Sequence, residues 1–143
     1  MTELDPAIGA QEACVALHSA GWRILALTNY SQEATAHLLG RAGLLGHFEA
    51  LLSTDQVRKT KPHPEVYQMA RRRAGADGEE GDLWLVAAHA WDVAGASRAG
   101  LRTAWISRSE GQYLAVYPKP DVIARDPREA AARMIDLYSS RAS

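Results

Sequence analysis

The sequence predicts a single α/β domain of three layers, in which helices cover both faces of a mainly parallel sheet. Three observations support this prediction. Short, continuously apolar runs alternate along the chain with segments of helical periodicity. Of the 143 residues, 47% are hydrophobic, which is enough to build a core. No repeat, low-complexity tract or linker-like stretch divides residues 1–143, so we expect one domain.

Strands are expected at the short apolar runs. The first contains Ile24-Leu25-Ala26-Leu27, which has no polar residue between its apolar ones and is typical of a strand covered on both faces. The expected strands are residues 22–27, 48–53, 83–86 and 103–106, with 121–124 as a further candidate. Because helical segments separate these runs, right-handed crossovers and a parallel sheet follow.

Helices are expected between the strands, and several carry start or stop signals. Ser31 can cap a helix that ends at Gly43. Pro64 suits the first turn of a helix that stops near Gly75. Residues 126–129, Asp-Pro-Arg-Glu, have the cap, proline and glutamate of a helix start. The other expected helices are residues 13–20 and 91–99, and residues 77–81 are expected to form an acidic loop.

Composition argues against several classes of function. The net charge of -1 gives no general electrostatic reason to bind nucleic acid or an anionic membrane. No apolar run approaches the length of a membrane span, and the first residues lack the pattern of a signal peptide, so we expect a cytoplasmic protein. The single cysteine, Cys14, cannot form an internal disulfide and is expected to be a buried, inert thiol.

Some large side chains are assigned to the core or the surface by their spacing. The tryptophans Trp22, Trp84 and Trp105 lie in strand-like runs and are expected in the core. Tyr138 belongs to the apolar stripe expected on the last helix. The run at residues 71–73, Arg-Arg-Arg, is expected on the solvent face of its helix.

Polar residues directly follow the first strand, at the edge of a parallel sheet where ligands bind. Thr28 and Asn29 offer a hydroxyl, an amide and backbone N–H groups that can hold an anionic oxygen. The same residues can also form a helix cap without any ligand. Two interpretations of Thr28 and Asn29 therefore stay open, an anion-binding site and a helix cap without a ligand.

Two further runs carry candidate site residues. Lys61 lies in a cationic loop made rigid by prolines, where it could hold a nucleophile ionised or belong to a solvated basic loop. His89 and Asp92 follow the strand at 83–86 and pair a potential proton carrier with an acid. Alternatively, His89 is a buried histidine and Asp92 an acid stabilised by the helix dipole.

Taken together and in order, these runs resemble the haloacid dehalogenase superfamily, most closely its L-2-haloacid dehalogenase branch (type II). Residues 27–31, Leu-Thr-Asn-Tyr-Ser, resemble the second motif of that family. Lys61 within residues 61–67 resembles the lysine motif, and residues 86–96, with Ala90-Trp91-Asp92 intact, resemble the fourth. The resemblance covers nearly the whole chain and implies a Rossmann-like, three-layer core.

The resemblance implies a hydrolase in which an aspartate displaces halide from the carbon next to a carboxylate. The substrate would be a small carboxylate or halocarboxylate. Lys61 would pair with the aspartate, Thr28 and Asn29 would hold oxygen or halide, and Asp92 would orient the lysine or the hydrolytic water. His89 stands where the family often has an asparagine, and it could act on that water.

A magnesium-dependent phosphatase of the same superfamily is a further alternative. Its metal would be held by the nucleophile and by an acidic fourth motif. Ala88-His89 lacks the acidic pair expected there, and Asp92 alone is a poor site for a hard cation. We therefore expect a site without a metal or another cofactor.

No run fits the family's first motif, an apolar strand that ends in the nucleophilic aspartate. Asp5 follows Glu3-Leu4 rather than an apolar strand, and Glu12 lies within the first expected helix. The helical cap of the family is also not found. We therefore expect the C-terminal part of the family's fold, a truncated hydrolase that is weakly active or inactive alone. A non-catalytic binding or interaction protein is the alternative.

The first-motif strand would lie between the strands at 22–27 and 83–86. Without it, backbone hydrogen-bonding groups and apolar faces need other partners. Three outcomes are open: the two neighbours close up, another chain fills the gap, or the chain is a fragment of a longer one. The second outcome includes a homodimer and a separate chain that supplies the strand.

Overall fold

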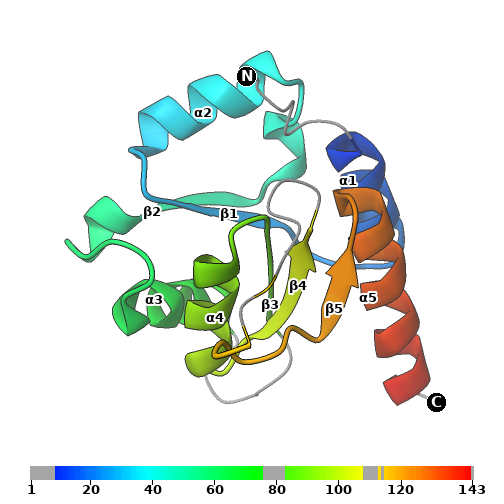
Figure 1. Cartoon of the computed structure of the whole chain (residues 1–143). Coiled ribbons are helices and arrows are strands. Elements are labelled where there is room, and N and C mark those ends of the chain that lie inside the picture. Colours follow the sequence, from blue (N-terminus) through cyan, green and yellow to red (C-terminus); the bar gives the residue numbers. More distant parts are fainter. Residues whose placement is uncertain (1–8, 76–82, 108–112, 114, 143) are drawn as a thin grey trace.

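Helices and strands alternate along the chain in a computed structural model that describes residues 9–75, 83–107, 113 and 115–142 (Figure 1). The helices are α1 (Ala10–Ser19), α2 (Gln32–Arg41), α3 (Pro64–Ala74), α4 (Ala90–Arg98) and α5 (Pro127–Ala142). The strands are β1 (Leu25–Thr28), β2 (Ala50–Ser53), β3 (Trp84–Ala87), β4 (Arg102–Ile106) and β5 (Val122–Ala124). Two short 3-10 helices, η1 (Leu45–His47) and η2 (Thr54–Gln56), flank β2. The five expected strands and five expected helices are confirmed, with shifted ends; the expected loop at 77–81 and the acid Asp5 lie outside the described residues.

The strands form two parallel sheets rather than one. β1 pairs with β2, and β3, β4 and β5 pair in that order. Within the described residues, no strand pairing joins the two sheets. The two strands on either side of the expected gap, β1 and β3, therefore do not close up, which rules out the first of the three outcomes for this structure.

The difference between edge and central strands is visible in their burial. β4 has a partner on both sides, and Thr103 and Ala104 within it are fully buried. All four residues of β1 are only half-buried, and Val86 in β3 is 39% exposed. The expectation that β1 is covered on both faces is wrong. Within the described residues β1 pairs with β2 alone, so the side chains of β1 stay partly exposed to solvent.

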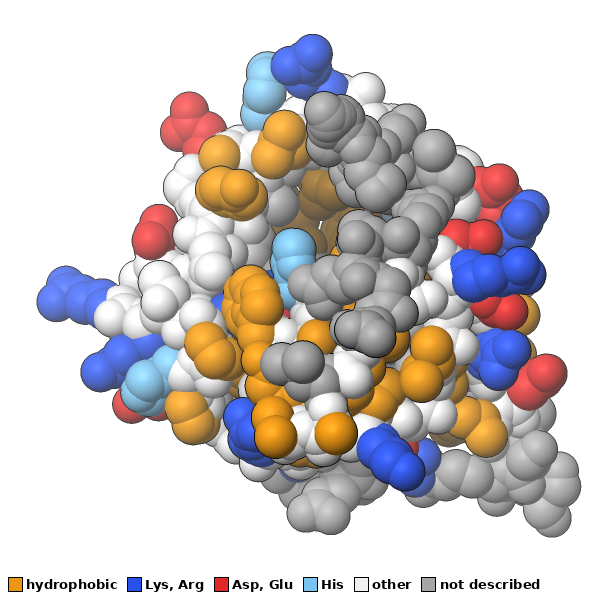
Figure 2. Space-filling model, in the orientation of Figure 1, with side chains coloured by type: hydrophobic (Ala, Val, Ile, Leu, Met, Phe, Trp, Pro, Cys, Tyr) orange, Lys and Arg blue, Asp and Glu red, His pale blue; other side chains and the backbone are white. Residues whose placement is uncertain are grey.

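Helices cover the three-stranded sheet on both sides (Figure 1). On one side α5 contacts β4 and β5 and also packs against α1, and on the other α4 contacts β3 and β4 and packs against α3. The main apolar core lies under α5 and contains Ala104, Ile106, Val122, Ala124, Ala130 and Met134. Charged side chains lie mostly around the periphery of the face drawn in Figure 2, while hydrophobic side chains are exposed towards its middle. None of the described helices combines the length and hydrophobicity that crossing a membrane requires.

The expected helix signals are confirmed by hydrogen bonds and backbone angles. The Ser31 hydroxyl accepts a hydrogen bond from the Ala34 amide at 3.0 Å. Gly75 ends α3 with a φ of 77°, a left-handed conformation that favours glycine. At the start of α5, Asp126 Oδ1 accepts from the Glu129 amide at 2.9 Å.

Several expectations about single side chains are decided by the packing. Cys14 is buried, as expected, and burial raises the pKa of its thiol. Arg71 is buried rather than solvated, because its guanidinium donates to the Gly100 carbonyl at 3.4 Å. Tyr138 is 55% exposed and not in the core, although its ring contacts Trp22 edge-on at 5.6 Å.

We predict that Gly95→Ala destabilises the fold by about 1–3 kcal/mol, the usual effect of overpacking. A Cβ at Gly95, in α4, would lie 2.6 Å from Pro62 Cβ and 3.0 Å from the Tyr67 ring, so the loop or the ring must move. Gly46→Ala is the matched control, because a Cβ there meets nothing within 4 Å. Urea unfolding of both variants tests this, and equal stabilities would contradict the packing described.

Candidate active site

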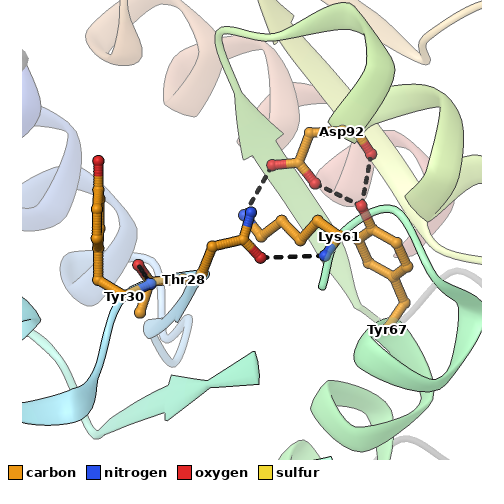
Figure 3. Close-up of polar contacts among 6 residues, drawn as sticks. Thr28, Tyr30, Lys61, Tyr67 and Asp92 are labelled. Atoms are coloured by element: carbon orange, nitrogen blue, oxygen red, sulfur yellow. Dashed lines mark hydrogen bonds and ion pairs between the residues drawn. The ribbon is translucent and has the colours of Figure 1, made fainter. Parts of the chain in front are cut away.

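Three segments that are distant in sequence meet at the carboxyl ends of β1 and β3 (Figure 3). Asn29, directly after β1, accepts a hydrogen bond through Oδ1 from the Lys61 amide at 3.0 Å. The Lys61 ammonium in turn binds Asp92 Oδ2 at 2.8 Å. Asp92 lies in the first turn of α4, which follows β3. The structure thus brings Asn29, Lys61 and Asp92 together at the sheet edge where the sequence predicts a site.

The Lys61–Asp92 ion pair is largely shielded from water, with side-chain exposures of 11% and 6%. A buried pair persists only where good geometry and further hydrogen bonds offset the loss of hydration. Asp92 has such a bond, because its Oδ1 accepts from the Tyr67 hydroxyl at 2.6 Å. Both carboxylate oxygens are therefore engaged, and the carboxylate is held in one orientation.

Lys61 keeps donor capacity beyond this pair. An ammonium group has three donor protons. Within the described part of the chain, Asp92 is the one acceptor bound to the Lys61 ammonium. The remaining protons can therefore bind another anionic oxygen or a halide.

Tyr67 is a member of the site to which the sequence analysis gave no role. It lies in α3 and is fully buried. Its hydroxyl donates to Asp92 Oδ1 and also lies 3.2 Å from the Asp92 carbonyl. Burial and the hydrogen bond to Asp92 raise the pKa of Tyr67 well above its ordinary value, so it stays a neutral donor. Its place beside Val66 on the apolar side of α3 was the available signal, because a buried tyrosine hydroxyl usually finds a partner.

Thr28 and Asn29 have different parts in the structure. The Thr28 hydroxyl accepts from the Tyr30 amide at 3.0 Å, which closes a local turn. Ser31, and neither of these two residues, caps α2 through its side chain. Asn29 holds the backbone of Lys61, so it links the end of β1 to the lysine loop.

His89 lies at the solvent boundary of the site. Its side chain is exposed, which overturns the alternative of a buried histidine. Its ring stacks on Trp91, with ring centroids 5.6 Å apart and planes 14° from parallel. The residue before it, Ala88, is fixed by a hydrogen bond, because Trp105 Nε1 of β4 donates to the Ala88 carbonyl at 3.1 Å. The role of His89 in the reaction stays a prediction.

The donor set at this edge does not suit a divalent cation. Both oxygens of Asp92 accept hydrogen bonds from Lys61 and Tyr67, so neither is directed to a metal. In the parts of the chain that are described, no three His, Cys, Asp or Glu side chains gather as a metal site would require.

We predict that Asp92→Asn destabilises the fold by about 3 kcal/mol, because it leaves the Lys61 ammonium buried beside an amide. The matched control is Glu49→Gln, which removes an exposed ion pair with Arg23 and should cost much less, because solvent screens that pair. In the double variant Lys61→Met/Asp92→Asn the loss should be smaller than the sum of the single losses. Chemical denaturation measures these three variants and Lys61→Met alone, and additive losses would contradict the coupling.

We also predict a pH dependence from Tyr67. The pKa of Tyr67 is raised in the folded chain, whereas the unfolded chain releases this proton near pH 10. The stability from this group is therefore complete below about pH 10 and falls above it, by up to about 1.4 kcal/mol per pH unit. Tyr67→Phe should reduce this slope by up to one proton. Unfolding free energies measured between about pH 9 and about pH 11 give the slopes. Parallel curves for the unchanged chain and Tyr67→Phe would refute this prediction.

Comparison with known proteins places this chain in a family. Residues 2–100 match the haloacid dehalogenase-like hydrolases. Haloacetate dehalogenase H-2 from Moraxella sp. (strain B) is 34% identical over 105 residues, which are 73% of this chain and 46% of that protein. (S)-2-haloacid dehalogenase 2 from Pseudomonas sp. (strain CBS-3) is 29% identical over 118 residues, which are 82% of this chain and 51% of that protein. The chain thus spans about half the length of the curated relatives it matches.

Solved structures agree with these relatives. A crystal structure of an L-2-haloacid dehalogenase is 27% identical, with a TM-score of 0.79, and the match covers 85% of this chain and 53% of that one. The L-2-haloacid dehalogenase from Xanthobacter autotrophicus is 21% identical, with a TM-score of 0.78 over 90% of this chain and 60% of that one, and supports the fold alone. The fold, a Rossmann-like α/β core with parallel strands, is that of these enzymes. From the family match and its relatives together, the chain belongs to the haloacid dehalogenase-like hydrolase family.

Proposed function

We propose that this chain carries the lysine–aspartate part of a hydrolase site that removes halide from small 2-halocarboxylates. The observation that carries the proposal is the buried Lys61–Asp92 pair, held by Tyr67 at the carboxyl edge of the strands. The names of the relatives, which are haloacetate and (S)-2-haloacid dehalogenases, support the substrate class. The chain would bind such a substrate through its carboxylate and its halogen.

In the proposed reaction, a nucleophilic carboxylate forms a C–O bond to the carbon that carries the halogen, and the C–X bond breaks to release halide. Water then attacks the carbonyl carbon of the resulting ester. This step releases a 2-hydroxycarboxylate and a proton, and it restores the carboxylate. Lys61 would hold the nucleophile ionised, and Asp92 would orient Lys61. Thr28 and Asn29 would contact the oxygen or halide, and His89 would act on the water.

The nucleophile is the part for which the described residues offer no candidate. Asp92 is the carboxylate bound to Lys61, but both its oxygens are engaged, so it cannot attack a substrate in this arrangement. We infer that the attacking carboxylate comes from outside the described residues. Because no run of the sequence fits the family's first motif, we expect the chain alone to be weakly active or inactive.

Two alternatives remain as competing proposals. A non-catalytic protein that binds a small anion would keep Lys61 and Asn29 without needing a nucleophile. A phosphatase would need Mg²⁺, for which the engaged oxygens of Asp92 are a poor ligand set. The phosphatase alternative has a relative among the matches, since a pyrophosphatase from Halalkalibacterium halodurans is 28% identical over 85% of this chain.

We predict that the chain binds (S)-2-chloropropionate weakly and releases little or no chloride from it. Binding, measured by titration calorimetry, should be lost in Lys61→Met, because the ammonium is the cation within the site. Lys59→Met removes a neighbouring exposed cation and should leave binding unchanged. Chloride release is measured in the same samples with a halide electrode.

Each other outcome has a distinct meaning. Turnover by this chain alone that survives Lys61→Met would contradict the proposed site. Absence of binding, or equal loss in both lysine variants, would contradict the substrate class. Magnesium-dependent hydrolysis of p-nitrophenyl phosphate would favour the phosphatase. Binding that depends on Lys61 but accepts any small carboxylate equally would favour the non-catalytic alternative.

A further inference from the structure

β5 is the outermost strand of the three-stranded sheet, at the opposite end from β3, which leads into the candidate active site (Figure 1). Within the described residues, β5 pairs with β4 alone. We propose that this edge is an interface between two copies of the chain, in which β5 pairs with β5 of the partner subunit as antiparallel strands about a two-fold axis at Ile123. The proposal concerns assembly and does not depend on the proposed function.

The backbone of Ile123 is directed outwards from the sheet. The Ser107 amide donates to the Ala124 carbonyl at 2.8 Å, so the carbonyl of Ala124 faces β4. Successive residues of a strand direct their N–H and C=O groups to opposite sides, so those of Ile123 face the outer edge. An antiparallel hydrogen-bonded pair exchanges these two groups, and a two-fold axis places Ile123 opposite itself.

The outermost strand of the other sheet, β2, is less suited to such pairing. Its Leu51 carbonyl already accepts a hydrogen bond from Gln32 Nε2 of α2, at 2.7 Å. Among the described residues, no side chain makes a hydrogen bond of this kind to the backbone of Ile123. The outer edge of β5 is therefore the one that keeps its backbone groups available.

The charges on either side of Ile123 fit this register. With the axis at Ile123, Asp121 lies opposite Arg125 of the partner subunit, and Arg125 lies opposite the partner subunit's Asp121. The Arg125 side chain is 87% exposed and the Asp121 side chain 38%, so both are accessible. Moving the axis to Val122 or Ala124 would lose both pairs. Because this pattern is complementary to itself, it favours a second copy of the chain over an unrelated strand.

A groove on the α5 side of this edge adds side-chain contacts. Its volume is about 490 Å³, and its lining includes Ile123 of β5 and Arg133, Asp136 and Leu137 of α5. Ile123 is 51% exposed and Leu137 40%, so two large apolar side chains lie at this surface. In the proposed dimer each α5 presents the same three residues to the other, and Arg133 and Asp136 are opposite in charge.

The position of α5 is compatible with a continuous sheet. α5 contacts both β4 and β5 and therefore lies over the pair. Paired strands are about 4.8 Å apart, so continuing the sheet through β5 places the axes of the two α5 helices about 10 Å apart. Packed helices have axes about 8–10 Å apart. Strand pairing and helix packing can therefore occur in the same dimer.

The first experiment traps the proposed pair with a disulfide. In Ile123→Cys, two thiols meet at a hydrogen-bonded pair whose Cα atoms are about 5.5 Å apart, which a disulfide can span. Tyr30→Cys is the matched control, because Tyr30 is 65% exposed and random collisions would favour it over Ile123. Under mild oxidation, we expect the Ile123→Cys dimer to form at least tenfold faster on non-reducing gels. The unchanged chain, whose single cysteine is the buried Cys14, gives the background.

The second experiment measures association without added cysteines, by sedimentation equilibrium at rising concentrations. The paired edge is short, so we expect a dimer that dissociates on dilution. Arg125→Glu puts like charges opposite each other twice and should raise the dissociation constant at least tenfold. Arg128→Glu makes the same charge change at an exposed residue outside the paired strand and should leave it unchanged. Circular dichroism checks that each variant is folded.

The proposal is overturned if Ile123→Cys cross-links no faster than Tyr30→Cys. It is also overturned if a dimer forms that Arg125→Glu does not weaken, since the copies would then meet elsewhere. Selective cross-linking by a dimer too weak for sedimentation would support the interface.

Hydrogen exchange of the Ile123 amide tests for another occupant of the edge. Exchange should be fast in the dilute monomer and at least tenfold slower in the dimer. Slow exchange in the dilute monomer would show that a different segment of the chain covers β5, which would overturn the proposal.

Discussion

The buried ion pair of Lys61 and Asp92 is the interaction on which the arrangement of the two sheets depends. Lys61 is bonded through its backbone to Asn29 at the end of β1 and through its ammonium to Asp92 after β3. One residue therefore connects the two-stranded sheet to the three-stranded sheet. Removing two charges from water is unfavourable, so this connection persists only with the additional hydrogen bond from Tyr67.

A second contact joins the sheets at their other end. Trp22, just before β1, contacts both Trp84 of β3 and Tyr138 of α5 with its ring. The two sheets are thus joined by aromatic contacts at the amino ends of β1 and β3 and by polar contacts at their carboxyl ends, and Leu27 of β1 and Leu85 of β3 also pack against the same buried apolar cluster. Between these two attachments, β1 and β3 have no pairing with each other in the described structure. This arrangement explains how β1 and β3 keep the same direction although, among the described residues, they do not pair with each other.

The sequence was sufficient to predict the helices and strands and to predict which edge of the sheet carries the candidate site. Apolar runs located all five strands, and caps such as Ser31 located helix ends, because both depend on neighbours in sequence. The rule that parallel strands share a carboxyl edge was enough to bring Lys61 and Asp92 together. The partial burial of β1 was not predictable from its composition, since it depends on whether a strand lies beside it. The buried guanidinium of Arg71 likewise depends on the Gly100 carbonyl, which only the packed fold places nearby.

Tyr67 shows why the chemistry of this edge also required the structure. In sequence, Asp92 is an acid at a helix start that could pair with a lysine or be stabilised by the helix dipole, and that alone is a poor site for a metal ion. In the fold, a neutral tyrosine occupies one carboxylate oxygen and an ammonium group the other. The raised pKa of Tyr67 keeps its proton on the hydroxyl, so this oxygen of Asp92 is not released by ordinary changes of pH. Both oxygens of Asp92 are therefore engaged by Lys61 and Tyr67, and in the proposed function the positive charge that would meet an anionic substrate at this edge is the lysine ammonium.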